Sequence, residues 1–252
     1  SPFIEPGLGD KAMAAREAKT FKEIVAAFAA DPHGIAAILI EPIQCEGGDH
    51  HFRPQFFAKL REYADRYEAM LIFDEVQTGI GSTGKMWAYE HTGVTPDLIA
   101  FGKKTQVCGV LSTSRIDEIP TNVFTVSSRI NSTWGGNLVD MVRAAQYLRI
   151  IQDEKLVENA ARVGERLQAG LAALAEEFPM VTNVRGKGLL CAMDLPDADT
   201  RSKVRQGCWD RGLAVLVCGS RSIRFRPPLV FTKKEADRTV STLRKVLKQI
   251  AK

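Results

Sequence analysis

Groups able to do chemistry stand at the ends of short apolar runs in the sequence. Asp74 lies within 70-MLIFDEV-76, and Lys103 and Lys104 follow 98-LIAF-101. A carboxylate that ends an apolar run is costly to bury unless a cation or a strong donor meets it. A carboxylate that faces a ring nitrogen, together with a lysine that forms a Schiff base, is what a protein contributes to pyridoxal phosphate chemistry. Taken alone, Asp74 also fits a turn cap or the partner of a structural arginine, and the lysines fit a solvated loop pair.

The elements around these groups predict an α/β sheet. Apolar spacing predicts a helix over 19–30 and another that Pro54 opens, while 35-IAAILIEPI-43, 70–76 and 98–101 are unbroken apolar runs. Such runs are typical of strands buried on both faces of a parallel sheet that helices cover. In these sheets ligands bind beyond the carboxyl ends of the strands, where the groups named above stand.

The second part of the chain is predicted to be a separate unit. After 131-NSTWGGNL-138 the sequence is strongly helical, and a break near 152–154 marks the predicted boundary between domains 1–152 and 153–252. Strand patterns and a capping box that opens a final amphipathic helix follow, at 181-VTNVRGKGLLCAMDL-195, 213-LAVLVCG-219 and 232-TKKE-235. The C-terminal domain is therefore predicted to be small and α+β.

Composition favours a small-molecule partner. The 252 residues are 45% hydrophobic, with a formal net charge of +4 and interleaved basic and acidic residues. This pattern indicates neither a nucleic-acid nor a membrane partner, and no apolar run has the roughly 20 residues of a membrane helix. The five cysteines are widely spaced and form no C-x-x-C pair. They argue against a disulfide framework or a zinc site and favour a reducing cytoplasm.

Two further motifs are interpreted as structural. Asp49-His50-His51 suggests a metal site, but adjacent histidines on a loop rarely face one ion, so a solvated turn and no metal are predicted. The glycines of 186-GKG-188 lack the third glycine of a dinucleotide fingerprint and indicate a tight entry into a strand.

An ordered set of motifs resembles the class III, or ω-amino acid, aminotransferases that use pyridoxal phosphate. The likeness covers almost all of the chain, and the motifs are 41-EPIQCEGG-48, 72-IFDEVQTG-79, 96-PDLIAFGKK-104, 131-NSTWGG-136, 184-VRGKGLL-190 and 223-IRFRPPL-229. The resemblance implies the fold type I of pyridoxal-phosphate-dependent transferases. It also implies that 1–152 is the second half of the large, cofactor-binding parallel-sheet domain and that 153–252 is the small C-terminal domain.

The resemblance implies the residues that bind the cofactor. The family pattern places its Schiff-base lysine six residues after the aspartate of the PD dipeptide, here Asp97, and so selects Lys103 as catalytic. By the same matching, Asp74 partners the pyridine nitrogen, Gln77 hydrogen-bonds the phenolic oxygen, and Thr133 binds the cofactor phosphate of the neighbouring subunit in a homodimer. Without the family, Gln77 fits a polar loop residue and Thr133 fits an N-cap cluster.

The resemblance also implies the residues that bind substrate. Strand alternation sends Arg224 and Arg226 to one face and Phe225 to the other. Family matching selects Arg224 as the clamp for the α-carboxylate of 2-oxoglutarate, a task that suits a bidentate guanidinium. Glu46 resembles the glutamate that pairs with this arginine while the amine donor reacts, and an exposed loop glutamate is the alternative. Cys45 departs from the small residue that usually precedes this glutamate.

Within the family, FGKKTQVCG and NSTWGGNL are most similar to members that act on L-lysine, whereas GSTGKMWAYEH and SIRFRP favour 4-aminobutyrate as the competing donor. The implied reaction moves the terminal amine of L-lysine to 2-oxoglutarate by a ping-pong mechanism and gives 2-aminoadipate 6-semialdehyde and glutamate. Family members carry a long N-terminal portion, with the phosphate cup, before the position of Ser1. The alternative of another class is therefore a catalytically silent fragment or an interaction protein that keeps these motifs.

Overall fold

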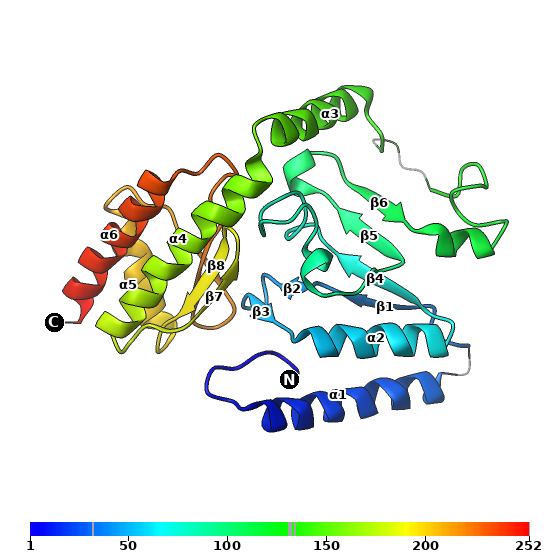
Figure 1. Cartoon of the computed structure of the whole chain (residues 1–252), viewed down its shortest axis with the longest axis horizontal. Helices are drawn as coiled ribbons and strands as arrows, with labels where there is room; N and C mark the ends of the chain where they lie inside the picture. The colour runs from blue at the N-terminus through cyan, green and yellow to red at the C-terminus, as the bar shows by residue number, and fades with distance from the viewer. Residues whose placement is uncertain (32, 131–132, 134, 252) are drawn as a thin grey trace. The chain divides into compact units, whose positions relative to one another are not determined.

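The computed structural model describes residues 1–31, 33–130, 133 and 135–251, which form two compact units (Figure 1). Unit 1 consists of Ser1–Pro42, Phe52–Gln77 and Ala88–Ile150. Unit 2 consists of Ile43–His51, Thr78–Trp87 and Ile151–Lys252. Two short segments from the first part of the sequence thus group with the C-terminal residues, which the sequence does not indicate. The predicted domain boundary at residues 152 and 153 stays a prediction.

Unit 1 is built on a four-stranded sheet in the order β1-β4-β5-β6. The strands are β1 (Ala37–Ile40), β4 (Met70–Asp74), β5 (Leu98–Phe101) and β6 (Gly109–Ser112). As predicted, β1, β4 and β5 run parallel, whereas β6, a strand not among those predicted, pairs antiparallel with β5. The α/β prediction is confirmed for the three strands that carry the apolar runs.

Helices α1 (Asp10–Ala30) and α2 (Pro54–Arg66) lie side by side along this sheet (Figure 1). The stacked rings of Phe28 and Tyr67, with centroids 4.4 Å apart, join the end of α1 to the residue after α2. The apolar face of α2 packs against β4. Pro54 is the first residue of α2, where its missing N–H removes no helical hydrogen bond. Both predicted helices are confirmed, although α1 begins earlier than residue 19.

The first predicted strand is shorter and more exposed than the sequence suggests. The apolar run 35–43 yields only β1, in which Leu39 is 66% exposed. Because β1 is an edge strand of this sheet, the described residues cover Leu39 incompletely. The prediction that this strand is buried on both faces is therefore wrong for the described chain. Beyond Pro42 the run leaves the sheet, and Ile43 begins the separate strand β2 (Ile43–Gln44).

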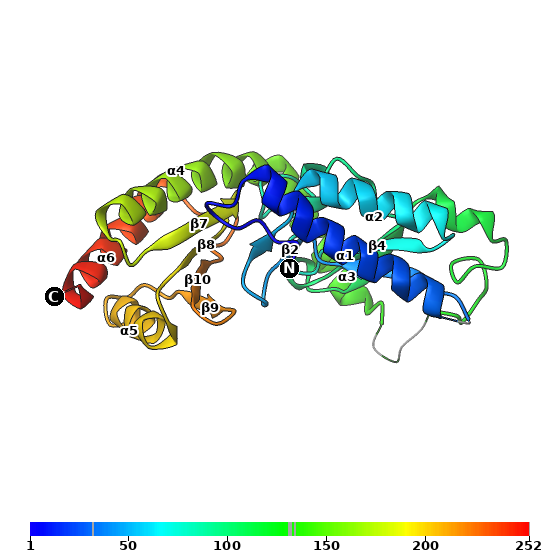
Figure 2. The same cartoon turned by 90° about the horizontal axis from the view of Figure 1, so that it is seen from below.

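Unit 2 packs three helices along an antiparallel sheet in the order β7-β8-β10-β9 (Figure 2). Its elements are α4 (Leu156–Glu177), β7 (Thr182–Lys187), β8 (Leu190–Asp194), α5 (Ala198–Trp209), β9 (Leu216–Cys218), β10 (Ser222–Phe225) and α6 (Lys233–Ile250). Leu171, Met193 and Phe225 are among the buried residues of one core that helices and sheet share. The predicted α+β character of this region is confirmed.

Local capping signals are reproduced in unit 2. The hydroxyl of Thr232 accepts from the Glu235 amide at 3.3 Å, and the Glu235 carboxylate accepts from the Thr232 amide at 2.8 Å. This reciprocal pair is the capping box predicted at the start of α6. The remaining elements are β3 (His50–His51), α3 (Leu138–Asp153) and the 3-10 helices η1 (Ala88–His91), η2 (Lys103–Thr105) and η3 (Ser114–Glu118). Among the described residues, no helix has both the length and the apolar character that crossing a membrane requires.

The core of unit 2 predicts a graded response to truncation of leucines. Leu171 is fully buried on α4, whereas Leu216 on β9 is 49% exposed. Leu171→Ala should lower the free energy of unfolding by about 2–5 kcal/mol, because it removes apolar contacts and leaves a cavity. Leu216→Ala should lower it by only about 0.5 kcal/mol. Urea unfolding followed by circular dichroism measures both, and equal losses would contradict this location of the core.

Candidate functional site

Asp74 and Lys103 belong to neighbouring parallel strands that end at the same edge of the unit 1 sheet. Asp74 is the last residue of β4 and lies in register with Ala100 of β5. The Glu75 amide continues the ladder by donating to the Ala100 carbonyl at 2.9 Å. Strand β5 ends at Phe101, and Lys103 begins η2 just beyond it. The carboxylate and the amine are therefore held at one strand edge, as the sequence predicts.

The two lysines differ in their surroundings, although both lie in η2, past the end of β5. Lys103 has a positive φ of 54° and an exposed side chain. The Lys104 ammonium turns back and donates to the Gln77 carbonyl at 2.8 Å. Lys104 therefore fixes the loop that carries Gln77, and the alternative of a solvated loop pair does not hold for Lys104.

The acidic pair at the end of β4 also divides its tasks. Glu75 is 1% exposed, and its carboxylate accepts from the amides of Ala88 at 2.6 Å and Tyr89 at 2.8 Å. The half-buried Asp74 accepts from the Val76 amide at 3.0 Å through one carboxylate oxygen. Glu75 thus anchors η1, and Asp74 is the more accessible acid at the strand edge. The anchoring role of Glu75 is not evident from the sequence, because it depends on amides 13 and 14 residues away.

Thr133 lies in a turn before α3, and its side chain is exposed. The predicted N-cap cluster 131–133 includes positions 131 and 132, which lie outside the described residues. The amide of Val139 donates to the Asn137 side chain at 3.0 Å, so Asn137 caps the start of α3. The capping alternative therefore does not account for Thr133, and its role in binding phosphate stays a prediction.

In unit 2, Glu46 and Arg224 form the ion pair that the resemblance implies. A guanidinium nitrogen of Arg224 donates to the Glu46 carboxylate at 2.5 Å, and the two side chains are 11% and 71% exposed. Arg224 lies in β10, where the adjacent Phe225 faces the apolar core. Two further guanidinium nitrogens of Arg224 are buried, with no hydrogen-bond partner in the described part of the chain. This buried donor set suits a carboxylate.

The segment Asp49-His50-His51 is not a solvated turn, and that prediction is wrong. His50 and His51 form β3, which pairs antiparallel with β2. Asp49 is 1% exposed and accepts a hydrogen bond from the Arg226 guanidinium, while burial raises the pKa of its carboxyl. Burial, aided by the cations Arg185 and Lys187, lowers the pKa of His51 to about 3. The described residues contain no group of three or more potential metal-binding side chains.

Cys45 is a packing residue. Its side chain is fully buried and clusters with Ile43 of β2 and Leu190 of β8. Its carbonyl accepts from the amides of Gly48 and Asp49 at 3.3 and 3.0 Å. The departure from a small residue at this position is therefore accommodated by an apolar cluster beneath the turn that carries Glu46.

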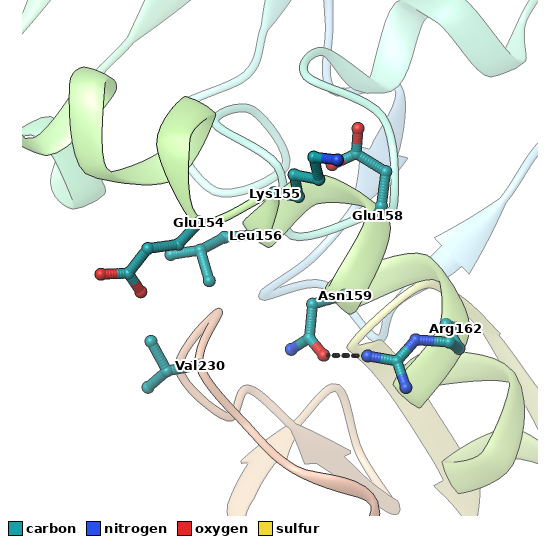
Figure 3. A pocket seen from close by; sticks show the side chains of 7 residues that line it. All are labelled: Glu154, Lys155, Leu156, Glu158, Asn159, Arg162 and Val230. Carbon is teal, nitrogen blue, oxygen red and sulfur yellow. Dashed lines mark hydrogen bonds between the residues drawn. The ribbon is translucent and has the colours of Figure 1, made fainter.

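Surface hollows in unit 2 do not identify a second site. One cavity of about 410 Å³ is lined by Glu154, Lys155, Leu156, Glu158, Asn159, Arg162 and Val230 (Figure 3). Arg162 donates to the Asn159 side chain at 2.8 Å, and Lys155 points toward Glu158 (Figure 3). None of the predicted site residues lines this cavity. Another hollow of about 380 Å³ has Arg224 and Arg226 among its lining residues, beside mainly apolar ones.

Comparison with protein families decides the class. Residues 6–247 match the family described as aminotransferase class-III. The chain belongs to this family. Class-III aminotransferases use pyridoxal phosphate and have the fold type I implied by the resemblance, so these two predictions are confirmed at the level of the family. The parallel strands of unit 1 are consistent with that fold.

Individual members of the family show which aminotransferases this chain is similar to. The chain is 51% identical over 248 residues to the L-lysine-epsilon aminotransferase of Mycobacterium bovis, covering 98% of this chain and 55% of that protein. It is 40% identical over 205 residues to the human mitochondrial 4-aminobutyrate aminotransferase, covering 80% of this chain and 40% of that protein. The lysine aminotransferase structure from M. tuberculosis, in the internal aldimine form, is 50% identical with a TM-score of 0.97, over 99% of this chain and 58% of that one. The class-III chain thus spans about half the length of these relatives.

The imidazole of half-buried His51, whose Nε2 is fully buried, predicts a loss of stability in acid. Its folded pKa of about 3 lies below the ordinary 6.5, so the unfolded state binds the extra proton between these values. The contribution of His51 to the free energy of unfolding is fully present above pH 6.5. Below that pH the free energy of unfolding falls by about 1.4 kcal/mol per pH unit, which amounts to about 2 kcal/mol by pH 5. His51→Gln should remove that part of the loss. Urea unfolding at pH 7 and pH 5 measures it, and His33→Gln controls for losing an exposed imidazole.

Proposed function

We propose that the polypeptide carrying this chain is an aminotransferase that moves the terminal amine of L-lysine to 2-oxoglutarate, giving 2-aminoadipate 6-semialdehyde and glutamate. The observation that carries the proposal is the 51% identity to an L-lysine-epsilon aminotransferase over 98% of the chain. The location of Asp74 and Lys103 at the ends of the neighbouring strands β4 and β5 supports it. The absence of a membrane-spanning helix among the described residues is consistent with the proposed cytoplasmic location.

The donor set of unit 1 fits pyridoxal phosphate. An exposed amine at Lys103 and a half-buried carboxylate at Asp74 stand at one strand edge, next to the loop of Gln77 that Lys104 fixes. We assign Lys103 to covalent attachment, Asp74 to the pyridine nitrogen, and Gln77 to the phenolic oxygen. Thr133 is assigned to the phosphate of the neighbouring subunit in a homodimer.

These residues divide the work of the reaction. The bound cofactor supplies an electron sink for the charge that develops at the substrate carbon. Asp74 keeps the ring nitrogen protonated, because its carboxylate favours the positive charge there. The Nζ of Lys103, when not bonded to the cofactor, would serve as the base that takes the proton from the substrate carbon. This assignment requires one lysine with an accessible amine, which matches Lys103 and not Lys104.

Arg224 and Glu46 are assigned to the choice between the two substrates. The amine donor has no carboxylate next to its reacting carbon, and Glu46 then neutralises Arg224. The α-carboxylate of 2-oxoglutarate adjoins the reacting carbonyl and takes the place of Glu46 on the guanidinium. The same guanidinium would thus serve both half-reactions in turn, as a ping-pong mechanism requires. The buried, unpartnered nitrogens of Arg224 support this role.

A second candidate donor is 4-aminobutyrate. The 40% identity to the human 4-aminobutyrate aminotransferase over 80% of the chain favours it over other ω-amino acids. A panel of donors with 2-oxoglutarate as acceptor, read by glutamate formation and by trapping of the aldehyde product, separates the two. Glutamate formed from 4-aminobutyrate but not from L-lysine would replace the named donor and keep the reaction class.

Lys103 predicts the test for cofactor binding. Pyridoxal phosphate added to the purified chain should give a visible absorption band that borohydride bleaches, and peptide mass mapping should then place the cofactor on Lys103. Lys103→Met should lose the band and lower transamination at least about a hundredfold. Lys19→Met, which removes an exposed lysine of α1, is the matched control. A band that survives in Lys103→Met would contradict the assignment. No band with the unchanged chain would show that its residues alone do not complete the site.

Arg224 predicts a selective loss for one substrate. Arg224→Met should lower kcat/KM for 2-oxoglutarate by about 100-fold, since it removes a charge-assisted pair with the α-carboxylate. The half-reaction with the amine donor should change far less. Arg221→Met is the control, because Arg221 directly precedes β10 and its side chain is 53% exposed. Stopped-flow kinetics measures each half-reaction separately. Equal losses in both half-reactions would contradict the assignment of Arg224 to the α-carboxylate.

A further inference from the structure

The backbone of the turn that carries Glu46 is held from several sides. The amides of Gly48 and Asp49 donate to the Cys45 carbonyl, and the Gly219 amide donates to the Glu46 carbonyl at 3.0 Å. A Cβ added at Gly219 would lie 3.0 Å from both the carbonyl oxygen of residue 47 and the Cα of Gly48. Turn 45–49 is therefore hydrogen-bonded within itself and packed closely against the residue that follows β9.

Two arginines from the second sheet clamp the end of this turn. Arg185 of β7 donates to the carbonyls of Gly48 at 2.5 Å and Asp49 at 2.9 Å. Arg226, which follows β10, donates to the Asp49 carboxylate. Asp49 has a φ of 52°, a left-handed conformation that costs a residue with a Cβ about 1 kcal/mol or more. A strained backbone at a 1% exposed residue persists because these contacts determine it.

The clamping arginines are themselves fixed. Arg185 also donates to the Asp194 carboxylate at 2.8 Å and to the Ser222 hydroxyl at 3.0 Å, and both side chains of the Arg185–Asp194 pair are at most 10% exposed. Ser222 in turn donates to Asp194 at 2.6 Å. The clamp is thus part of a buried network across three strands. By contrast, the Glu46 side chain is 71% exposed.

We propose that Asp49, clamped by Arg185 and Arg226, is a positioning residue that fixes the backbone beneath Glu46, so that Glu46 engages and releases Arg224 by side-chain rotation alone. This inference rests on the proposed function for the use of two substrates. Its physical basis is the contrast between an ion pair with an exposed partner, which breaks readily, and a buried ion pair, which does not. A moving backbone would have to break the buried pair in every half-reaction.

Amide hydrogen exchange on the chain tests the fixed backbone without substrate or cofactor. Glu46→Ala removes the ion pair with Arg224 and should leave the exchange of the Gly48, Asp49 and Gly219 amides as in the unchanged protein. Asp49→Asn should speed exchange at residues 48, 49 and 219 by about tenfold, because it removes the carboxylate charge that pairs with the Arg226 guanidinium. Asp237→Asn, on α6, breaks an exposed ion pair 2.6 Å long with Arg166 of α4 and is the matched control.

Two outcomes would overturn the proposal. One is faster exchange in Glu46→Ala, equal to that in Asp49→Asn, because the turn would then move with Glu46. The other is unchanged exchange in Asp49→Asn. If Asp49→Asn fails to fold, as judged by lost protection throughout α4, Arg226→Lys replaces it. Lysine keeps the charge but not the shape of the guanidinium, so the same acceleration is expected.

The preference of the enzyme for one amine donor over another gives a second test, because general destabilisation lowers the activity with both donors equally. A misplaced Glu46 would leave Arg224 open to the α-carboxylate of glutamate. Asp49→Asn should therefore lower the ratio of kcat/KM for the ω-amine donor to kcat/KM for glutamate by about tenfold. A loss shared equally by both donors would overturn the positioning role. If the unchanged protein shows no transamination, the proposed function fails, and the exchange experiment alone judges the fixed backbone.

Discussion

The register of β4 against β5 is the constraint on which the candidate cofactor residues depend. A slip of one residue would turn Asp74 to the opposite face of the sheet. Asp97 fixes the register at the far end of the strands, where its carboxylate accepts from the Leu71 amide at 2.7 Å and its amide donates to the Leu71 carbonyl at 2.8 Å. Arg61 and Arg115 donate to the same carboxylate at 2.9 and 3.2 Å. Asp97, a buried acid paired with two cations, therefore fixes the register that brings the ends of β4 and β5 together.

This anchor gives the spacing between Asp97 and Lys103 a physical meaning. The interval contains β5, and an extended strand advances about 3.3 Å per residue. With Asp97 tied to Leu71, the length of β5 decides how far beyond the sheet η2 begins. An inserted or deleted residue would move Lys103 away from Asp74 while both residues stayed in the sequence. The six-residue interval thus determines how far Lys103 lies from the anchored start of β5 at Asp97.

The sequence predicts what local patterns determine and fails where distant charges meet. The capping box of Thr232 and the strand end at Asp74 follow from short patterns, and the structure contains both. The burial of Asp49 does not, because its partners Arg185 and Arg226 lie 136 and 177 residues away. Without those partners an Asp-His-His segment is polar and fits a solvated turn. The assignment of Lys103 rests on the spacing typical of the family, because the two-residue period of a strand does not extend into η2.

Arg224 of β10 and Arg226, which follows this strand, pair with carboxylates that differ in burial. Arg226 meets a buried carboxylate, and removing one partner of such a pair leaves an uncompensated buried charge that costs about 3–5 kcal/mol. Arg224 meets the exposed Glu46, and ion pairs with solvent-exposed partners are worth about 1 kcal/mol or less. On the proposed function, this inequality is what the chemistry needs. A substrate carboxylate can displace Glu46 at small cost, and the buried pair beside it holds its place while that exchange occurs.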